Sequence, residues 1–283
     1  MNSASRRIWL CADDYGISPG VNRAICDLIA KGRLNATSVM MVGPAIGRHD
    51  VAALQDVVAE RHARGNRCSV GLHVTLTAPF RPLTMHFRPA DGGMFLPLPT
   101  MLQRGFVRRL DREIIQSEIA AQFSAFGDLF GRAPDFADGH QHAQLFPVVR
   151  DAFLAATATN APGAWVRQGG RNRPLLKRLN SPKALLLDAL SGQFRKRAAR
   201  SGIAFNTSFA GAYDYVRKPD FGVMMQQFLH GLPDGALVMC HPGFVDDTLE
   251  GLDPLTTQRE HEHTFLASEQ FPALMAANKV TLS

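Results

Sequence analysis

The strongest constraint on the fold is an alternation, repeated along the chain, between short apolar runs and longer segments with helical periodicity. Several apolar runs are continuous rather than alternating, which is typical of strands covered on both faces. Strands that alternate with helices form a parallel sheet, so we expect an α/β fold. About seven or eight such units in 283 residues favour a closed barrel over an open sheet. The predicted strands are 7–12, 37–42, 68–76, 134–138, 164–167, 203–206, 236–240 and 279–282.

The predicted helices begin and end at recognisable residues. Ser18 can cap the first helix, Pro19 suits its first position, and Gly32 ends it. A second long helix is expected over 111–130. The residues 78–109 are rich in Pro and Gly and predict a long loop. Further helices are predicted over 146–156, 182–200, 220–229 and 256–277.

Composition and charge favour one large domain. The chain is 46% hydrophobic and 20% charged, which is ordinary for a globular protein with a sizeable core. We therefore expect a single domain over 1–283, with a loop-rich insert at about 78–109 and a basic insert at about 167–200. The net charge of +6 arises in the second insert, where ten basic residues accompany one acidic residue.

The basic segment has two interpretations. Cations at the end of a predicted helix complement the helix dipole, and this is the interpretation we favour. The alternative is a surface that contacts a membrane or an anionic substrate, which would suit a lipid-linked sugar. The segment lacks the pattern of interleaved aromatic residues that single-stranded nucleic acid requires, so we expect no nucleic-acid partner.

No segment predicts a membrane span or a cysteine-based site. No run approaches the ~20 apolar residues needed to cross a bilayer, and the run 8–12 is too short for a signal-peptide core. The four cysteines show no CxxC spacing, so neither a thiolate zinc site nor a disulfide framework is expected. We expect a cytoplasmic protein.

Four polar clusters directly follow predicted strands. They read CADDYG at 11–16, VGLHVTLT at 70–77, FADGHQH at 136–142 and VMCHPGF at 238–244. Because the carboxyl ends of parallel barrel strands meet at one mouth, we expect the ionisable side chains of these clusters to share one cleft. Those side chains are Asp13, Asp14, His73, Asp138, His140, His142 and His241.

The residue types in these clusters suit metal-assisted hydrolysis. Two imidazoles and one carboxylate bind a divalent metal and leave positions open for water and substrate. Neighbouring residues at a strand end point in different directions, so Asp13 and Asp14 can take different roles, one as ligand and one as general base. In HQH, residues i and i+2 of an extended segment face the same way. Each cluster alone favours a structural role, whereas four at strand ends favour a site.

The clusters resemble the motifs of the YdjC-like carbohydrate deacetylases, a family that includes chitooligosaccharide deacetylases and proteins associated with hopanoid biosynthesis. The stretch ADDYG is similar to their ADDFG signature, and GLHVTLT to their GLHLxLT motif. DGHQHAQLFP is similar to DSHxHxHxxP, and MCHPGFVDD to the C-terminal HPG segment. The order and spacing agree across nearly the whole chain. The resemblance implies a distorted (β/α) barrel, in agreement with the alternation of strands and helices.

The resemblance also implies roles for individual residues. Asp14, His73 and His140 would bind the metal. Asp13 would be the general base, and His241 the general acid that protonates the departing amine. Four further residues are expected to orient the ligands or to contact the substrate: Tyr15, Asp138, His142 and Arg167. Asp138 could equally be a capping or turn carboxylate.

The implied enzyme is a metal-dependent hydrolase that removes an acetyl group from an N-acetylated oligosaccharide or glycolipid. Two histidine ligands favour zinc or another borderline metal, and magnesium or another divalent ion stays open. One alternative is a different metal-dependent hydrolase, such as an amidohydrolase or a phosphoesterase. The other is a carbohydrate- or lipid-binding protein without turnover. Because related barrels often pair, a homodimer also stays open.

A fifth polar cluster, REHEHTF at 259–265, resembles a metal site at first sight. On a helix, however, His261 and His263 are two residues apart and do not face each other. The spacing therefore predicts a solvated helix face.

Overall fold

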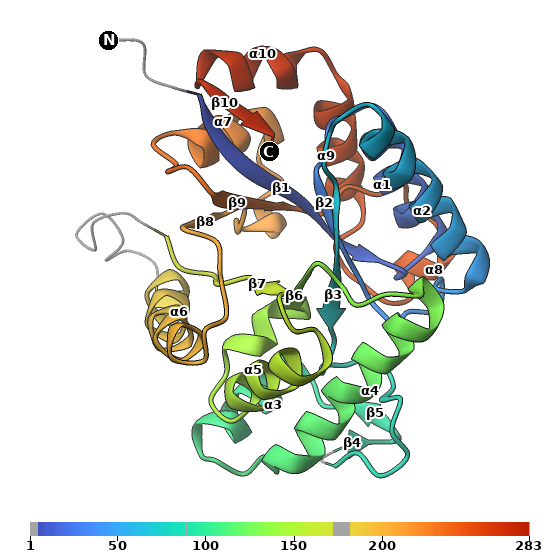
Figure 1. Ribbon diagram of the computed structural model, residues 1–283, viewed down its shortest axis with the longest axis vertical. Helices are drawn as coiled ribbons and strands as arrows, with labels where there is room; N and C mark the ends of the chain where they lie inside the picture. Colours follow the sequence, from blue (N-terminus) through green and yellow to red (C-terminus); the bar gives the residue numbers. More distant parts are fainter. Residues whose placement is uncertain (1–4, 89, 172–181, 283) are drawn as a thin grey trace. The chain divides into compact units, whose positions relative to one another are not determined.

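The computed structural model describes residues 5–88, 90–171 and 182–282 (Figure 1). The chain forms two compact units. The first comprises Met1–Ser38, Pro44–Ser69 and Thr207–Ser283, and the second comprises Val39–Gly43 and Val70–Asn206. Among the helices in the described ranges, none is both long and apolar enough to cross a bilayer.

The sheet of the first unit is built on β1 (Arg6–Tyr15). This strand pairs in parallel with β9 (Ala236–Cys240) and with β10 (Val280–Leu282). On its other side lies β2 (Ala36–Val39), and β8 (Phe209–Ala210) pairs in parallel with β9. Every residue of β9 is buried, as its continuous apolar run predicted. Every residue of β2 is buried as well, although this strand ends at Val39, before the predicted residue 42.

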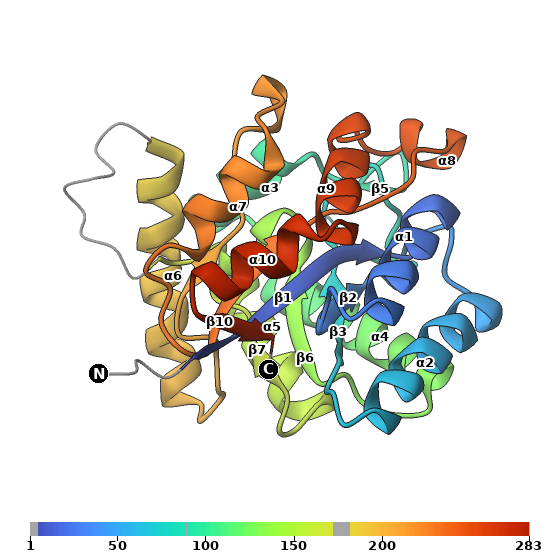
Figure 2. The same ribbon diagram turned by 90° about the horizontal axis from the view of Figure 1, so that it is seen from above.

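The helices of the first unit cover this sheet. Ser18 caps α1 by accepting a hydrogen bond from the Val21 backbone N–H at 3.2 Å, as predicted. Figure 2 shows α1 lying beside α2. The bounds are α1 Pro19–Ala30, α2 Arg48–Ala63, η3 Tyr215–Arg217, α7 Phe221–Leu229, α8 Asp247–Glu250, α9 Thr257–Ala267 and α10 Gln270–Ala277.

The helices of this unit differ from the prediction at two places. The single helix expected over 256–277 is divided, because Ser268 is extended and a new helix begins just before Pro272, whose missing N–H is tolerated in a first turn. The helix α2 was missed. Its buried apolar positions are only Val51, Leu54 and Val58, too few to give a clear periodic pattern.

The second unit repeats the pattern of parallel strands and helices. Strand β3 (Ser69–Val74) pairs in parallel with β6 (Phe136–Gly139), which pairs in parallel with β7 (Trp165–Val166). Asp111 caps α4 through two backbone N–H groups, and α6 has the predicted bounds. The helices are α3 Leu98–Phe106, α4 Arg112–Phe130, η1 His140–Leu145, α5 Val149–Asn160 and α6 Pro182–Arg200.

The segment 78–109 is more ordered than a long loop. Within the predicted long loop lie an antiparallel pair, β4 (Ala90–Asp91) and β5 (Met94–Phe95), and the helix α3, none of which was predicted. The buried carboxylate of Glu118 on α4 accepts hydrogen bonds from the Leu83 and Thr84 backbone N–H groups and from the Thr84 hydroxyl. These three hydrogen bonds offset the cost of burying the Glu118 carboxylate and hold the segment against α4.

The predicted strand over 203–206 is also wrong. Only an isolated bridge joins Phe205 to Val166, and the strand β8 begins later, at Phe209. The side chain of Asn206 instead accepts from the Gln168 backbone N–H at 2.9 Å and donates to the Gln168 carbonyl at 3.2 Å. An amide side chain that bonds backbone groups in this way replaces a strand ladder.

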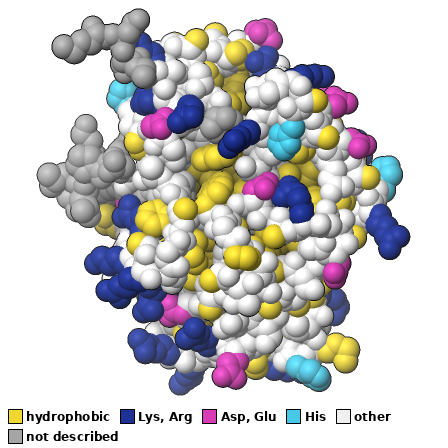
Figure 3. All heavy atoms as spheres, viewed as in Figure 1, with side chains coloured by type: hydrophobic (Ala, Val, Ile, Leu, Met, Phe, Trp, Pro, Cys, Tyr) yellow, Lys and Arg dark blue, Asp and Glu magenta, His cyan; other side chains and the backbone are white. Residues whose placement is uncertain are grey.

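The basic segment is described only in part. Figure 3 shows Lys and Arg side chains gathered on the exposed side of α6, where Lys196, Arg197 and Arg200 are exposed. The Arg197 guanidinium lies 3.0 Å from the Asp151 carboxylate. Cations in this last turn agree with the favoured interpretation, in which they complement the helix dipole. The basic residues Arg173, Lys177 and Arg178 lie outside the described residues.

A buried amide completes the hydrogen bonding of β1 beside the start of β2. Asn35 is fully buried, and its Oδ1 accepts from the Leu10 N–H at 2.7 Å while its Nδ2 donates to the Ile8 carbonyl at 2.9 Å. We expect Asn35→Leu to lower the free energy of unfolding by about 2–4 kcal/mol, because two buried backbone groups lose their partner. Urea unfolding measures this loss. Asn66→Leu, at an exposed turn, is the control and should change little; equal losses would contradict the assignment.

Candidate active site

The end of β1 carries two adjacent buried carboxylates in different backbone conformations. Asp13 and Asp14 are each 1% exposed. Asp14 has a φ of 69°, in the left-handed region, and its carbonyl accepts from the Ile17 N–H at 3.0 Å. This conformation interrupts the regular pleat of the strand, and Gly16, with a φ of 101°, completes the turn toward α1. The two aspartates are therefore not equivalent members of one strand.

Their surroundings differ as well. The Asp13 carboxylate lies 3.6 Å from the Cys11 thiol and 3.4 Å from the Ser38 hydroxyl, which are neutral donors. The Asp14 carboxylate accepts a hydrogen bond from the Arg259 guanidinium at 2.7 Å. Of these contacts, those of Asp13 come from neutral groups and that of Asp14 comes from a full positive charge.

His241 directly follows β9 and reaches Asp13. The His241 Nε2 lies 3.9 Å from the Asp13 Oδ2, and the Tyr215 hydroxyl lies 3.2 Å from the His241 Nδ1. Burial lowers the pKa of His241, and the negative charges of Asp14 and Asp13 oppose this shift. The Nδ1 of this imidazole therefore faces a hydroxyl group, and its Nε2 faces a carboxylate.

Three buried or half-buried residues of this region were missed from the sequence. Arg259 and Glu262 on α9 are fully buried, so a solvated face is the wrong interpretation for them. The spacing of Arg259, Glu262 and the buried Leu266 was the available signal, since it marks one helix face. Tyr215 gave no signal.

The sequence correctly predicted that the two histidines of this segment do not face each other. His261 is exposed, and His263 contacts Asp27 at 2.8 Å.

The second unit brings His73, Asp138 and Arg167 together. The parallel register of β3 and β6 places His73 opposite Asp138, and the His73 Nδ1 lies 2.6 Å from the Asp138 Oδ1. The Arg167 Nη1 lies 3.2 Å from the Asp138 Oδ2. All three side chains are at most 1% exposed. A carboxylate that accepts the Nδ1 proton of an imidazole leaves its Nε2 lone pair available to a cation, and this pairing is common for imidazoles that bind metals.

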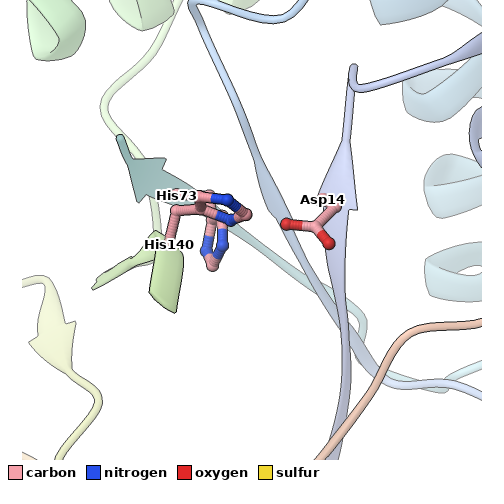
Figure 4. A group of neighbouring side chains, drawn as sticks. All are labelled: Asp14, His73 and His140. Atoms are coloured by element: carbon pink, nitrogen blue, oxygen red, sulfur yellow. The ribbon is translucent and has the colours of Figure 1, made fainter. Parts of the chain in front are cut away.

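His140 begins η1, directly after β6. Its ring centroid lies 5.5 Å from that of His73 and 5.7 Å from that of Phe80, both in edge-to-face contact. Figure 4 shows the two imidazoles together. Gln141 and His142 have φ values of 53° and 58°, so HQH forms a left-handed turn and the extended conformation predicted for it is wrong.

Tyr15 connects the end of β1 to α2. The ring is fully buried, and the hydroxyl donates to the Asp50 carbonyl at 2.6 Å. Burial is also the main reason why the pKa of Tyr15 is raised, with the neighbouring Cys26 adding to the shift. The hydroxyl is thus used within the fold and stabilises the strand that carries the two aspartates.

The available donor atoms fit a divalent metal. Asp14, His73 and His140 are buried, and each offers one atom of a kind that binds metal ions; Figure 4 draws their side chains and the elements that carry them. One carboxylate oxygen and two imidazole nitrogens are a common set for zinc and related ions. The Asp138 contact on His73 adds the outer hydrogen bond that such ligands usually have.

Glu262 gives the first unit a measurable pH dependence. Burial raises the pKa of this carboxyl to about 7 from an ordinary value of 4.5. Between these two values the unfolded chain releases the proton and the folded chain retains it, so the free energy of unfolding falls as the pH rises; above about 7 the loss is complete.

In the wild type, the free energy of unfolding should fall by roughly 3 kcal/mol between pH 4.5 and pH 7 because of Glu262. We expect this fall to be absent in Glu262→Gln, which cannot titrate. Urea unfolding of the protein with chelator at a series of pH values measures the slope. Glu260→Gln, at an exposed position on the same helix, is the matched control and should keep the wild-type slope. An unchanged slope in Glu262→Gln would show that another group titrates.

The chain is similar to curated proteins over most of its length. It is 27% identical over 245 residues to the chitooligosaccharide deacetylase of Escherichia fergusonii, covering 86% of this chain and 84% of that protein. It is 28% identical over 244 residues to the chitooligosaccharide deacetylase of Klebsiella pneumoniae, covering 85% and 82% respectively.

A solved structure shows the fold of the chain, and a family model shows its family. The chain superposes on a protein from Enterococcus faecalis, named as a candidate for cellobiose-phosphate cleavage, with a TM-score of 0.72 at 16% identity, covering 99% of this chain and 97% of that one. This similarity confirms the predicted fold class, a distorted α/β barrel. The family described as YdjC-like protein matches residues 7–277. The chain therefore belongs to the YdjC-like family.

Proposed function

We propose that this protein is a carbohydrate N-deacetylase that hydrolyses an acetamide group with the help of one divalent metal ion. Membership of the YdjC-like family and similarity to proteins named chitooligosaccharide deacetylase support the reaction class. The observation that carries the proposal is the unequal environment of two adjacent carboxylates, Asp13 beside neutral donors and His241, and Asp14 beside Arg259. Such a pair suits one general base and one ligand.

In this proposal Asp14, His73 and His140 hold the metal. When bound, the ion lowers the pKa of a water molecule and polarises the amide carbonyl. Two imidazole nitrogens favour zinc, and magnesium or another divalent ion is the alternative. The chain from Arg167 through Asp138 keeps the His73 ring in one orientation.

Asp13 and His241 handle the protons. The Asp13 carboxylate takes a proton from the attacking water as the new C–O bond forms. The His241 Nε2 gives a proton to the nitrogen as the C–N bond breaks, which releases acetate and a free amine. Burial lowers the pKa of His241, while the charges of Asp13 and Asp14 work against that shift and favour the imidazolium needed for this step.

The proposed substrate is an N-acetylated oligosaccharide or glycolipid. The curated relatives are named for chitooligosaccharides, which are N-acetylated sugars. His142 at the left-handed turn after His140 is the proposed substrate contact. The cytoplasmic location and the absence of a nucleic-acid partner stay predictions, and the membrane contact through 167–200 and the homodimer stay open alternatives.

The first test is acetate release from a panel of N-acetylated oligosaccharides and glycolipids. We expect release that stops when a chelator is added and returns with zinc, because the reaction needs the ion to activate water. Assays of phosphate esters and cyclic amides test the other hydrolases. Binding of the panel sugars without any acetate release would favour a binding protein and sink the proposal.

The second test separates the two aspartates. We expect Asp13→Asn to lower kcat by about 10²–10⁴-fold while metal affinity stays unchanged, because only the general base is lost. Asp14→Asn should weaken metal binding by at least about 100-fold. Isothermal titration with zinc and acetate assays at saturating zinc measure the two effects. If Asp13→Asn lost the metal and Asp14→Asn kept it, the two roles would have to be exchanged.

A further inference from the structure

The helix α9 (Thr257–Ala267) buries one basic and one acidic side chain on one face. Arg259 and Glu262 are three residues apart, so they lie one above the other on the helix, and both are 0% exposed. Between them His261 is exposed on the opposite face. Burying an ionisable side chain is costly unless it has hydrogen-bond partners. The partners of these two residues therefore indicate the role of the helix.

Arg259 connects α9 to the end of β1. Its Nη2 donates to the Asp14 Oδ2 and to the Asp253 Oδ2, each at 2.7 Å, and its Nε donates to the Leu255 carbonyl at 2.9 Å. Asp253 is itself tied to the preceding segment, where its Oδ1 accepts from the Leu255 N–H at 2.8 Å. The guanidinium is therefore held by Leu255 and Asp253 in addition to its contact with Asp14.

Glu262 connects the same helix to the end of β9. Its Oε2 accepts from the His241 backbone N–H and its Oε1 accepts from the Tyr213 hydroxyl, each at 2.5 Å. Tyr213 packs against Tyr215 at a centroid distance of 4.2 Å, and the Tyr215 hydroxyl meets the His241 Nδ1. The backbone and the ring of His241 are thus held from two directions.

We propose that α9 is the positioning element of this active site: Arg259 fixes the Asp14 carboxylate in its metal-binding orientation, and Glu262 fixes the residue that delivers the proton, His241. This inference rests on the proposed function, because it assigns α9 to the ligand and the acid of that reaction. Neither residue touches the substrate in this scheme. Each acts through the side chain or backbone that it holds.

The charge of Arg259 could either help or hinder a metal ion at Asp14. A lone guanidinium beside a ligand would repel the ion and weaken its binding. Here, however, Asp253 shares the same Nη2, so Asp14, Arg259 and Asp253 together carry a formal charge of −1. The group stays attractive to a cation while the Asp14 carboxylate is held still. Orientation should therefore outweigh repulsion, and loss of Arg259 should weaken metal binding.

The test of Arg259 uses metal affinity as its readout. Zinc titration against a competing chelator should show about a 10- to 100-fold weaker affinity in Arg259→Ala, the usual effect of losing an outer partner of a ligand. Added guanidinium should restore part of the affinity by filling the vacated space. Asp253→Asn, a milder change that loosens the guanidinium, should weaken binding by a smaller factor. His261→Ala, exposed on the same helix, should bind zinc as the wild type does.

The test of Glu262 separates positioning from stability. Glu262→Gln should lower kcat by about 10-fold at saturating zinc, with KM and zinc affinity unchanged, because only the setting of His241 changes. Thermal unfolding checks that each variant is folded at the assay temperature. If Arg259→Ala does not fold, Asp253→Asn decides the matter for Arg259.

The outcomes distinguish the two proposals. If the wild-type protein binds no divalent metal, the proposed function fails. If the wild type binds zinc and the folded Arg259 and Asp253 variants bind it equally or more tightly, the positioning role of Arg259 is wrong and the proposed function stands. Unchanged kcat in folded Glu262→Gln would remove Glu262 from the scheme in the same way.

Discussion

The hydrogen-bond register of parallel strands is the constraint on which both halves of the candidate site depend. In the first unit Ala12 of β1 pairs with Cys240 of β9, so the next residues along the two strands are Asp13 and His241. In the second unit the ladder of β3 and β6 pairs His73 directly with Asp138. A one-residue slip in either ladder would turn these side chains to the other face of the sheet. The register of the ladders therefore determines which side chains lie together, and the side-chain contacts depend on it.

Buried charges then fix the orientation of the groups that the ladders bring into place. Arg167, Asp138 and His73 form one such chain in the second unit, and Asp253, Arg259 and Asp14 form another in the first. In each chain an arginine holds a carboxylate, and apart from Asp253, which is 18% exposed, the side chains of both chains are almost fully removed from water. Buried pairs of this kind contribute little net stability but limit the available conformations. Their value here lies in keeping a few polar atoms still.

The sequence predicted β1, β3, β6 and β9 and the polar residues at their ends because both depend on local patterns. Continuous apolar runs predicted β9 with its observed bounds and β1 with bounds shorter by a few residues, and the polar clusters after β1, β3, β6 and β9 indicated the candidate residues. Arg259 and Glu262 escaped prediction because charged residues on a helix are usually exposed, and only the surrounding fold buries them. The turn at HQH escaped for a related reason, since the conformation of Gln141 and His142 has no clear local signal.

The left-handed backbone at Asp14 limits which acidic residue can occupy that position. Among residues with carboxylates, aspartate tolerates a positive φ because its short polar side chain can bond locally, whereas a glutamate would be strained by about 1–3 kcal/mol. The longer side chain would also carry its oxygens beyond the reach of an arginine fixed by Asp253 and Leu255. A conformation of the main chain thus selects one acidic residue over the other, although both offer the same chemical group to a cation.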